Sequence, residues 1–253
     1  MTVEVERNGN IATITLNRPD VRNAVDEETA SELFEAFSKV ENDPDIYVSV
    51  LWGKGGNFCA GADLKAISNG HLNALNKDMT KPGPMGPTRM QLQKPVIAAI
   101  SGYAVAGGLE LALWCDLRVA EEGSIFGVFN RRFGVPLIDG GTYRLPRIIG
   151  LGRALDLILT GRPISADEAL KIGLINRIVK KGDARTEAEN IAQKIASFPQ
   201  NCLRSDREAV YLGCGRPFKE AIEQEFLLGL KVIQSGEAIN GAKMFVDNKN
   251  RKR

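Results

Sequence analysis

Two short glycine-rich segments are the first candidates for chemistry. Residues 58–64 read FCAGADL, and residues 102–110 read GYAVAGGLE. Small residues let a backbone approach a ligand closely, and the first N–H groups of a helix have no partner inside that helix. Each segment follows an apolar run of strand length and precedes a helical pattern. If the two strands are adjacent, both turns could direct a backbone N–H at one oxygen, which is the arrangement of an oxyanion hole.

The glycines also have a purely structural interpretation. Glycine permits a tight turn between a strand and a helix without any ligand, and this alternative stays open for each segment. Neither segment matches GxGxxG or a phosphate loop ending in GK[ST], so nucleotide binding is the weaker functional interpretation.

One carboxylate follows the second segment directly. Glu110 lies three residues after Gly107, on the first turn of the expected helix. The positive end of a helix dipole favours an ionised carboxylate, so Glu110 is suited to hold a water molecule or to act as a base. The alternative is a glutamate that only complements the helix dipole.

Other reactive side chains are scarce. The chain has one histidine, His71, and four cysteines, Cys59, Cys115, Cys202 and Cys214, without a CxxC pair. No metal site is therefore expected, and the cysteines are interpreted as reduced thiols. His71 falls in an expected loop and is interpreted as a surface residue. Cys59 is interpreted as a small packed residue, because no histidine stands at a fixed spacing from it.

Composition sets the class of protein. The 253 residues include 43% hydrophobic and 25% charged residues, which excludes a disordered, collagen-like or disulfide-scaffold chain. A net charge of +2 demands no polyanionic partner. No apolar run is long enough for a membrane span, and residues 1–6 lack the features of a signal peptide. A cytoplasmic location is expected, with an organelle matrix open if a transit peptide was removed.

The elements that must position these residues alternate between strand and helix. Residues 11–16 alternate with period two and are expected to pair with residues 3–6 across Asn8-Gly9. Asp26 is expected to cap a helix that ends near Asp43-Pro44. Further strands are expected at residues 46–52, 96–100, 117–120 and 125–127, and a helix at 108–115. This alternation implies parallel pairing of strands and an α/β core.

Two regions depart from the alternation. Residues 69–87 contain three prolines and three glycines and are expected to form a long loop, either a functional lid or a disordered segment. Beyond residue 183 the pattern is helical, with helices expected at 188–198, 203–212, 218–233 and 237–246. This tail is either a small second domain or an arm that docks on a neighbouring subunit.

Several longer motifs carry a family resemblance. They are AGADL at residues 60–64, SGYAVAGGLELALWCDLRVA at 101–120, GVPLIDGGTYRLPRIIG at 134–150 and LTGRPISADEALKIGLINRIV at 159–179. Together they resemble the crotonase, or enoyl-CoA hydratase/isomerase, family, in the order that the family has them. The resemblance runs from about residue 3 into the helical tail.

The resemblance implies a fold and an assembly. It implies an α/β spiral core of ββα units, assigned to residues 1–195, and a C-terminal helical trimerisation region, assigned to residues 196–253. It also implies a homotrimer or homohexamer that acts on an acyl-CoA thioester. No resident cofactor is expected, because coenzyme A enters as part of the substrate.

The resemblance also implies a set of site residues. The oxyanion donors would be the N–H groups of Ala62 and Gly107. Coenzyme A would lie along the segment made by Ala60, Ala62, Asp63, Leu64 and Lys65. Arg22 is a further candidate for contact with the coenzyme A phosphates.

The second carboxylate of a hydratase is missing from its usual place. Glu110 matches the first glutamate of the resembling hydratases, but Asn130 stands where the second is expected. Asn130 can orient a water molecule but cannot exchange a proton. Asp139, nine residues downstream, is either the replacement acid or the cap of a helix that starts at Gly140.

Two neighbouring arginines have alternative roles. Arg131 or Arg132 could pair with Glu110 or Asp139, or bind a carboxylate at the far end of the acyl group. The alternative is a solvated surface pair.

These observations favour an enoyl-CoA hydratase-like lyase with Glu110 as the essential carboxylate. An isomerase or decarboxylase, for which one carboxylate suffices, is the alternative among enzymes. The alternative of another class is an RNA-binding relative, which the basic ending at residues 248–253 and Lys180-Lys181 would support. The near-zero net charge makes nucleic acid binding the weaker expectation.

Overall fold

The computed structural model describes the backbone of residues 1–250 and the side chains of residues 1–247. The chain divides into two compact units, Met1–Gln193 and a second that begins at Lys194. The boundary expected after residue 195 and the role of the tail in trimerisation stay predictions.

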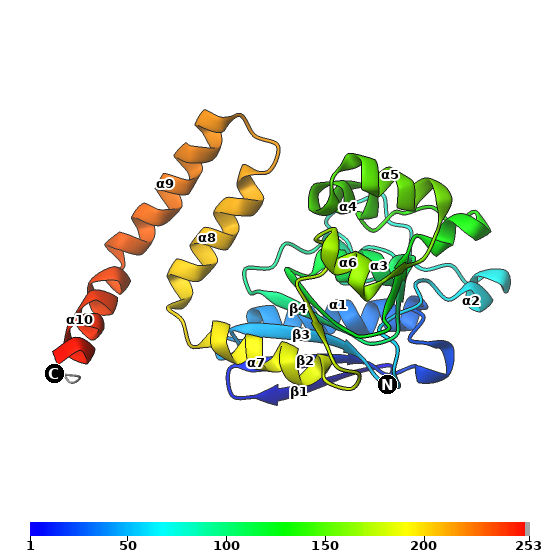
Figure 1. Cartoon of the computed structure of the whole chain (residues 1–253), viewed down its shortest axis with the longest axis horizontal. Coiled ribbons are helices and arrows are strands. Elements are labelled where there is room, and N and C mark those ends of the chain that lie inside the picture. The colour runs from blue at the N-terminus through cyan, green and yellow to red at the C-terminus, as the bar shows by residue number, and fades with distance from the viewer. Residues whose placement is uncertain (251–253) are drawn as a thin grey trace. The chain divides into compact units, whose positions relative to one another are not determined.

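A six-stranded sheet forms the centre of the first unit (Figure 1). Its strands lie in the order β1 (Val3–Asn8), β2 (Ile11–Leu16), β3 (Val48–Gly53), β4 (Val96–Ile100), β6 (Leu117–Glu121) and β9 (Arg177–Val179). The pairing of β1 with β2 is antiparallel, and every following pair is parallel. β3 and β4 are direct neighbours, so the two glycine-rich turns leave the same edge of the sheet.

Helix α1 (Glu27–Asn42) packs against β1 and β2. Asp26 caps it as expected, because its side chain accepts a hydrogen bond from Thr29 N at 2.9 Å. The buried face of α1 includes Leu33 and Phe37. Phe37 meets the ring of Trp114 edge to face at 4.8 Å between centroids, a favourable aromatic geometry.

The first unit also contains a three-stranded sheet. It consists of β5 (Tyr103–Val105), β7 (Ile125–Gly127) and β8 (Ile164–Ser165), and β5 pairs with β7 in parallel. Five further helices lie wholly in this unit: α2 (Leu64–Ser68), α3 (Gly107–Trp114), α4 (Gly141–Ile149), α5 (Leu151–Thr160) and α6 (Ala166–Lys171). It also has 3-10 turns at Pro19–Val21, Pro87–Arg89 and Phe129–Phe133.

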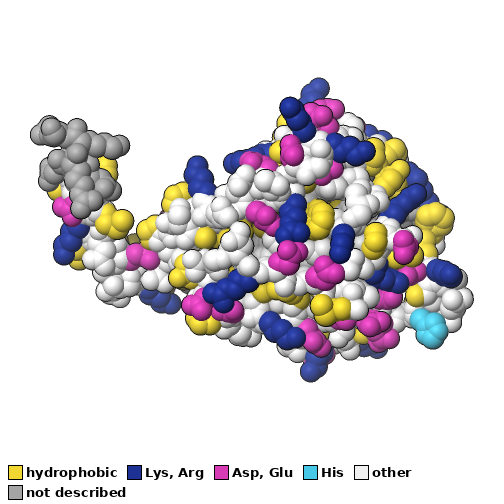
Figure 2. Space-filling view, turned by 90° about the horizontal axis from the view of Figure 1, so that it is seen from below, with side chains coloured by type: hydrophobic (Ala, Val, Ile, Leu, Met, Phe, Trp, Pro, Cys, Tyr) yellow, Lys and Arg dark blue, Asp and Glu magenta, His cyan; other side chains and the backbone are white. Residues whose placement is uncertain are grey.

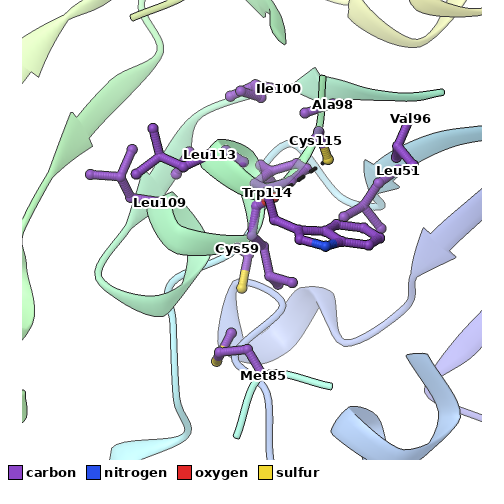
Figure 3. Packing of buried hydrophobic residues seen from close by; sticks show 14 of the residues in the cluster. Leu51, Cys59, Met85, Val96, Ala98, Ile100, Leu109, Leu113, Trp114 and Cys115 are labelled. Carbon is purple, nitrogen blue, oxygen red and sulfur yellow. Dashed lines mark hydrogen bonds between the residues drawn. The ribbon is translucent and has the colours of Figure 1, made fainter. Parts of the chain in front are cut away.

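Helix α3 lies in the hydrophobic core, and all its residues are buried. A helix that is buried on all sides has no solvent face and packs against neighbours in every direction. Figure 3 shows Leu109 and Leu113 on the side of α3 away from Trp114, with Cys59 and Met85 below the helix. The helix that carries Glu110 is therefore held rigidly from several directions.

The C-terminal unit is helical. α7 (Ala184–Ala196) spans the boundary between the units, and α8 (Gln200–Gly213), α9 (Phe218–Gln234) and α10 (Glu237–Asn250) follow. Glu237 accepts hydrogen bonds from Asn201 N at 3.3 Å and Cys202 N at 2.7 Å, so a carboxylate at the start of α10 stabilises the N-terminus of α8. Within residues 1–250 no helix has the length and apolarity to cross a membrane.

The expected elements are confirmed, with differences at their ends. The helix expected at 188–198 begins four residues earlier, at Ala184. Residues 69–86 contain no helix or strand beyond the end of α2, as expected, and a tight turn closes between Gly83 and Gly86 through two backbone hydrogen bonds of 3.0 and 2.8 Å. The short elements β5, β8, β9, α2 and α6 were not predicted, because segments of this length carry too little periodicity.

Candidate active site

The two glycine-rich turns meet beside the sheet. Cys59 and Ala104 form a parallel bridge, in which Cys59 N donates to Tyr103 O at 2.9 Å and Val105 N to Cys59 O at 3.1 Å. Val25 holds the first turn from its other side, because Val25 N donates to Gly61 O at 2.8 Å and Asp63 N to Val25 O at 3.0 Å. The two turns therefore lie side by side, and their use as an oxyanion hole stays a prediction.

Glycine is required where the turns touch. A Cβ on Gly61 would lie 2.8 Å from Gly107 N, and a Cβ on Gly108 would lie 2.1 Å from Cys59 O. Both distances are too short for a real carbon atom, and Gly61 also has φ +96°. The glycines therefore bring the backbone of Gly61 into direct contact with the N-terminus of α3.

The N–H groups of Ala62 and Gly107 have no hydrogen-bond acceptor among the residues that the structure describes. One neighbour of each is paired: Asp63 N donates to Val25 O, and Ala106 N to Gly127 O at 2.9 Å. Ala106 has φ +53°, a strained conformation for a residue with a side chain, and it is the residue directly before α3. Two donors without a described acceptor thus lie beside one junction.

Met85 packs against the second donor. A Cβ on Gly107 would lie 2.7 Å from Met85 Sδ, and the Met85 side chain is fully buried. Met85 belongs to the tight turn between Gly83 and Gly86. Gly86 has no room for a side chain either, because a Cβ there would lie 2.5 Å from Ala30 O of α1. This turn is therefore wedged between α1 and the start of α3.

Glu110 is buried, with its carboxylate fixed by backbone donors. Oε1 accepts from Asp139 N at 2.9 Å and from Gly141 N at 2.8 Å. Within residues 1–250 no donor bonds to Oε2, and this oxygen is not sealed from solvent. Burial raises the pKa of Glu110 from 4.5 to about 7, against the lowering effect of the Gly141 N–H. A carboxylate with that pKa and one free oxygen is suited to exchange protons near neutral pH.

Asp139 lies next to Glu110, and it does not cap α4. The residue before α4 is Gly140, and no side chain caps that helix. Instead Oδ1 of Asp139 accepts from Met85 N at 3.0 Å and from the Thr88 hydroxyl. Burial raises the pKa of Asp139, although both of these hydrogen bonds favour its ionised form. Among the described residues, no donor bonds to Oδ2.

The sequence did not indicate the two arginines near these carboxylates. Arg144 donates to Asp139 O at 2.8 Å and to Thr88 O at 2.7 Å, and Arg89 holds the long loop through Asn76 O at 2.9 Å. The positive charges of Arg89 and Arg144 both lower the pKa of Asp139. Arg144 lies within the motif of residues 134–150, but nothing in its spacing marked it for this role.

Asn130 is buried, and neither polar atom of its side chain is accessible to a ligand. Its Nδ2 donates to Val135 O at 2.8 Å, which ties the 3-10 turn to the segment leading to Asp139. Its Oδ1 is sealed from solvent and has no donor within the described residues. The role of Asn130 in orienting water stays a prediction that this arrangement does not favour.

The segment expected to carry coenzyme A forms the start of α2. Asp63 caps α2 by accepting from Lys65 N at 3.0 Å, and its other oxygen pairs with Arg18 at 3.0 Å. The Asp63 carboxylate is therefore occupied by protein partners. Leu64 and Lys65 are exposed, and Ala60 and Ala62 are half-buried. Contact with coenzyme A stays a prediction for all five residues.

Three further arginines lie on the surface. Arg22 is exposed, and its guanidinium lies 5.1 Å from the centre of the Tyr103 ring. A hydrogen bond of 3.0 Å from Ala60 N to Arg22 O joins its backbone to the first turn. Arg131 donates to Ile158 O and Arg132 to Gly161 O. The alternative in which Arg131 or Arg132 pairs with Glu110 or Asp139 is therefore wrong in this structure.

The remaining reactive side chains lie as interpreted. Cys59 is fully buried, and burial raises the pKa of its thiol to about 12, so it remains protonated and unreactive. His71 is exposed, and the only histidine side chain lies on the surface in Figure 2. In the described part of the chain, no cluster of three or more His, Cys, Asp or Glu side chains could hold a metal ion.

Comparison with known proteins decides the family. Residues 6–252 match the family model described as enoyl-CoA hydratase/isomerase. This chain belongs to that family. It is 39% identical to the enoyl-CoA hydratase EchA19 of Mycobacterium tuberculosis, over 97% of this chain and 93% of that protein. It is 37% identical to the (E)-benzylidenesuccinyl-CoA hydratase of Thauera aromatica, over 97% and 96%.

Solved structures of this family share its fold. The crystal structure of an enoyl-CoA hydratase from Mycobacterium tuberculosis superimposes with a TM-score of 0.92 at 34% identity, covering 98% of this chain and 96% of that one. The enoyl-CoA hydratase EchA1 from Mycobacterium marinum gives a TM-score of 0.91 at 34% identity, with the same coverage. The α/β crotonase-like core expected from the motifs is confirmed.

Proposed function

We propose that this family member is an enoyl-CoA hydratase-like enzyme that adds water across the double bond of an enoyl-CoA thioester. The observation that carries the proposal is the pair of unpartnered N–H groups on Ala62 and Gly107, with the free oxygen of Glu110 one helical turn further along α3. A thioester carbonyl oxygen that accepts both N–H groups can take on negative charge as an enolate forms.

Glu110 is the base in this proposal. Its Oε2 accepts a proton from water while the water oxygen bonds to the β-carbon and the double-bond electrons move toward the thioester carbonyl. The α-carbon then takes up a proton, and the enolate returns to a ketonic thioester. Water is thereby added without any gain or loss of electrons.

Asp139, in its protonated form, is the second carboxyl group in this proposal and gives its proton to the α-carbon. Proton exchange with solvent then returns Glu110 to its ionised form and Asp139 to its protonated form. The main-chain N–H of Asp139 donates to the carboxylate of Glu110, so the two acids are neighbours, and Oδ2 of Asp139 has no partner among the described residues. Asn130 cannot replace it, because an amide does not exchange protons and Oδ1 is sealed. General acid or base groups contribute about 10²–10⁴ in rate, which is the size of the effect assigned to Asp139.

A one-carboxylate reaction is the second candidate function, and the presence of Asn130 at the usual position of a glutamate favours it. In an isomerase, Glu110 alone would move a proton between two carbon atoms of the acyl chain. In a decarboxylase, loss of carbon dioxide would itself generate the enolate in the oxyanion hole. Both use the same two N–H groups.

We further propose that the enzyme assembles as a homotrimer or homohexamer through its helical tail. Large apolar side chains on α8, α9 and α10 are exposed, among them Val210, Phe226, Ile233 and Met244. Residues of these helices also line a groove of about 1000 Å³. Apolar surface on this scale is typical of an association site. Size-exclusion chromatography with light scattering measures the assembly.

No resident cofactor enters this proposal, and the expected location stays the cytoplasm. The RNA-binding alternative is not adopted. Residues 251–253 of its basic ending lie outside the described residues, and so do the side chains of residues 248–250. Lys180 and Lys181 are exposed, and positive and negative side chains are interspersed on the face shown in Figure 2.

The direct test follows the enoyl absorbance of crotonyl-CoA with purified protein. We expect turnover, and a loss of about 10²–10⁴ in kcat for Glu110→Gln and for Asp139→Asn. Glu121→Gln is the matched control, because Glu121 is a buried carboxylate held by Ser101 away from the site. Turnover at background level in wild-type protein would exclude hydration of this substrate. Movement of the double bond of a 3-enoyl-CoA would then support the isomerase.

A further inference from the structure

Thr88 donates its hydroxyl to the carboxylate of Asp139. Thr88 and Asp139 are both buried, and Met85 N donates to the same oxygen at 3.0 Å. The carboxylate oxygen Oδ1 thus receives two donors from residues 85–88, at the end of the long loop. A hydrogen bond to an ionised group in a dry environment is stronger than one between neutral groups.

The contact between Thr88 and Asp139 is held on both sides. Arg144 donates to Thr88 O at 2.7 Å and to Asp139 O at 2.8 Å, so one guanidinium joins the backbones of the two residues. A Cβ on Gly83 would lie 2.3 Å from the Thr88 hydroxyl and 2.8 Å from Asp139 Oδ1. The backbone of Gly83 therefore closes the space on the far side of the hydrogen bond, so that neither partner can easily turn away.

A single chain of contacts leads from Thr88 to the base. The Asp139 side chain binds Thr88, and the Asp139 main-chain N–H binds Oε1 of Glu110 at 2.9 Å. We propose that Thr88 is a positioning residue, whose hydroxyl holds Oδ1 of Asp139 so that the proton to be transferred is carried on Oδ2, the oxygen that no described donor occupies. This inference rests on the proposed role of Asp139 and extends it to a residue that touches no substrate.

The proposal explains why a buried carboxylate can serve here. Burial raises the pKa of Asp139, and the hydrogen bonds from Thr88 and Met85 N oppose that effect. Without the hydroxyl, Asp139 would bind a proton more tightly and could rotate about its side-chain bonds. As a weaker acid it would give its proton to the α-carbon more slowly.

The test compares Thr88→Val, which has nearly the same shape, with Thr88→Ser, which keeps the hydroxyl. We expect Thr88→Val to lower kcat for crotonyl-CoA by about 10- to 100-fold, the loss that a hydrogen bond to a charged group represents. KM should change little, since the two oxyanion donors are intact. The alkaline limb of the pH profile of kcat, where the proton donor is lost, should move to higher pH. Thr88→Ser should retain activity within about threefold, because serine offers the same donor.

Thr13→Val is the matched control. Thr13 is equally buried, and its hydroxyl donates to the carboxylate of Glu189 at 2.8 Å, away from the site. We expect this variant to lose stability without a shift in the pH profile. If Thr13→Val and Thr88→Val change kcat alike, Thr88 has only a structural role.

A double variant and a spectroscopic titration complete the test. If Thr88 acts through Asp139, Thr88→Val has almost no further effect on kcat in the Asp139→Asn background, because coupled residues are not additive. Carboxyl ¹³C NMR, with the Asp139 signal assigned from Asp139→Asn, should show its titration at higher pH in Thr88→Val. An unchanged titration would overturn the proposal even if wild-type protein hydrates nothing. Inactive wild-type protein with a shifted titration would reject the proposed reaction but support the positioning role.

Discussion

Replacing Glu110 with glutamine should make the protein more stable at high pH while it removes activity. Glutamine has the same shape, and its Oε1 can still accept from Asp139 N and Gly141 N. What the substitution removes is a buried negative charge. The ionised carboxylate is needed for the proposed chemistry, but burial makes its charge unfavourable in the folded state.

The size and sign of the effect follow from the pKa of Glu110, which is about 7 in the folded protein against 4.5 for a free side chain. Below pH 4.5 Glu110 is protonated in both the folded and the unfolded chain, so its ionisation does not lower the free energy of unfolding. As pH rises from 4.5 to 7, the unfolded chain loses the proton and the folded chain keeps it, so the free energy of unfolding falls. Above pH 7 the loss is complete, at about 3 kcal/mol.

The assay is urea unfolding of wild-type protein and Glu110→Gln from pH 5 to pH 8.5, at one fixed protein concentration because assembly contributes to stability. We expect Glu110→Gln to be more stable by about 3 kcal/mol at pH 8 and by less than about 1 kcal/mol at pH 5. The kcat of wild-type protein should rise with pH through about 7, as Glu110 ionises.

Two results would refute this reasoning. If wild-type protein and Glu110→Gln differ in stability by the same amount at pH 5 and pH 8, burial of the charged form of Glu110 does not destabilise the folded protein. A wild-type kcat that is flat between pH 6 and pH 8 would mean that Glu110 is not the titrating base. Glu121→Gln serves again as the control for removal of a buried carboxylate.

Three further outcomes are expected. Asn130→Ala should lower the melting temperature, because the hydrogen bond to Val135 O is lost. Its kcat should fall by less than about tenfold. A loss above about 100-fold would instead give Asn130 the role that we assign to Asp139. Gly107→Ala should lower kcat by about 10²–10³, because the new methyl group would lie 2.7 Å from Met85 Sδ and displace the Gly107 N–H. A kcat near that of wild-type protein would contradict the role of this N–H as an oxyanion donor. Dialysis against EDTA should leave kcat unchanged, and recovery of lost activity by a divalent metal would contradict the cofactor-free proposal.

The sequence predicted the elements that have clear periodicity. The antiparallel pair β1 and β2, helix α1 with its Asp26 cap and the parallel strands β3 and β4 were all predicted within a few residues. Their patterns are local, since a strand alternates with period two and a helix repeats every 3.6 residues. The glycine-rich turns were also informative, because at Gly61 and Gly108 there is no room for a side chain.

The arrangement around Asp139 was not predictable in the same way. An aspartate before Gly140-Gly141 has the sequence of a helix cap, yet its side chain turns away from α4 to Thr88 and Met85, about 50 residues earlier in the chain. Arg144 was likewise not expected to join Thr88 to Asp139. These contacts depend on how the turn at Gly83 packs against α4, and no local spacing reports a contact between segments so far apart.

The carboxylate of Glu110 is held by main-chain N–H groups of Asp139 and Gly141, and not by side chains. A main-chain donor remains whatever side chain the residue carries. Evolution could therefore exchange the amino acid at position 139, and with it the reaction that follows enolate formation, without displacing the base. Position 139 is accordingly the place where we would begin to redesign this scaffold for a different acyl-CoA reaction.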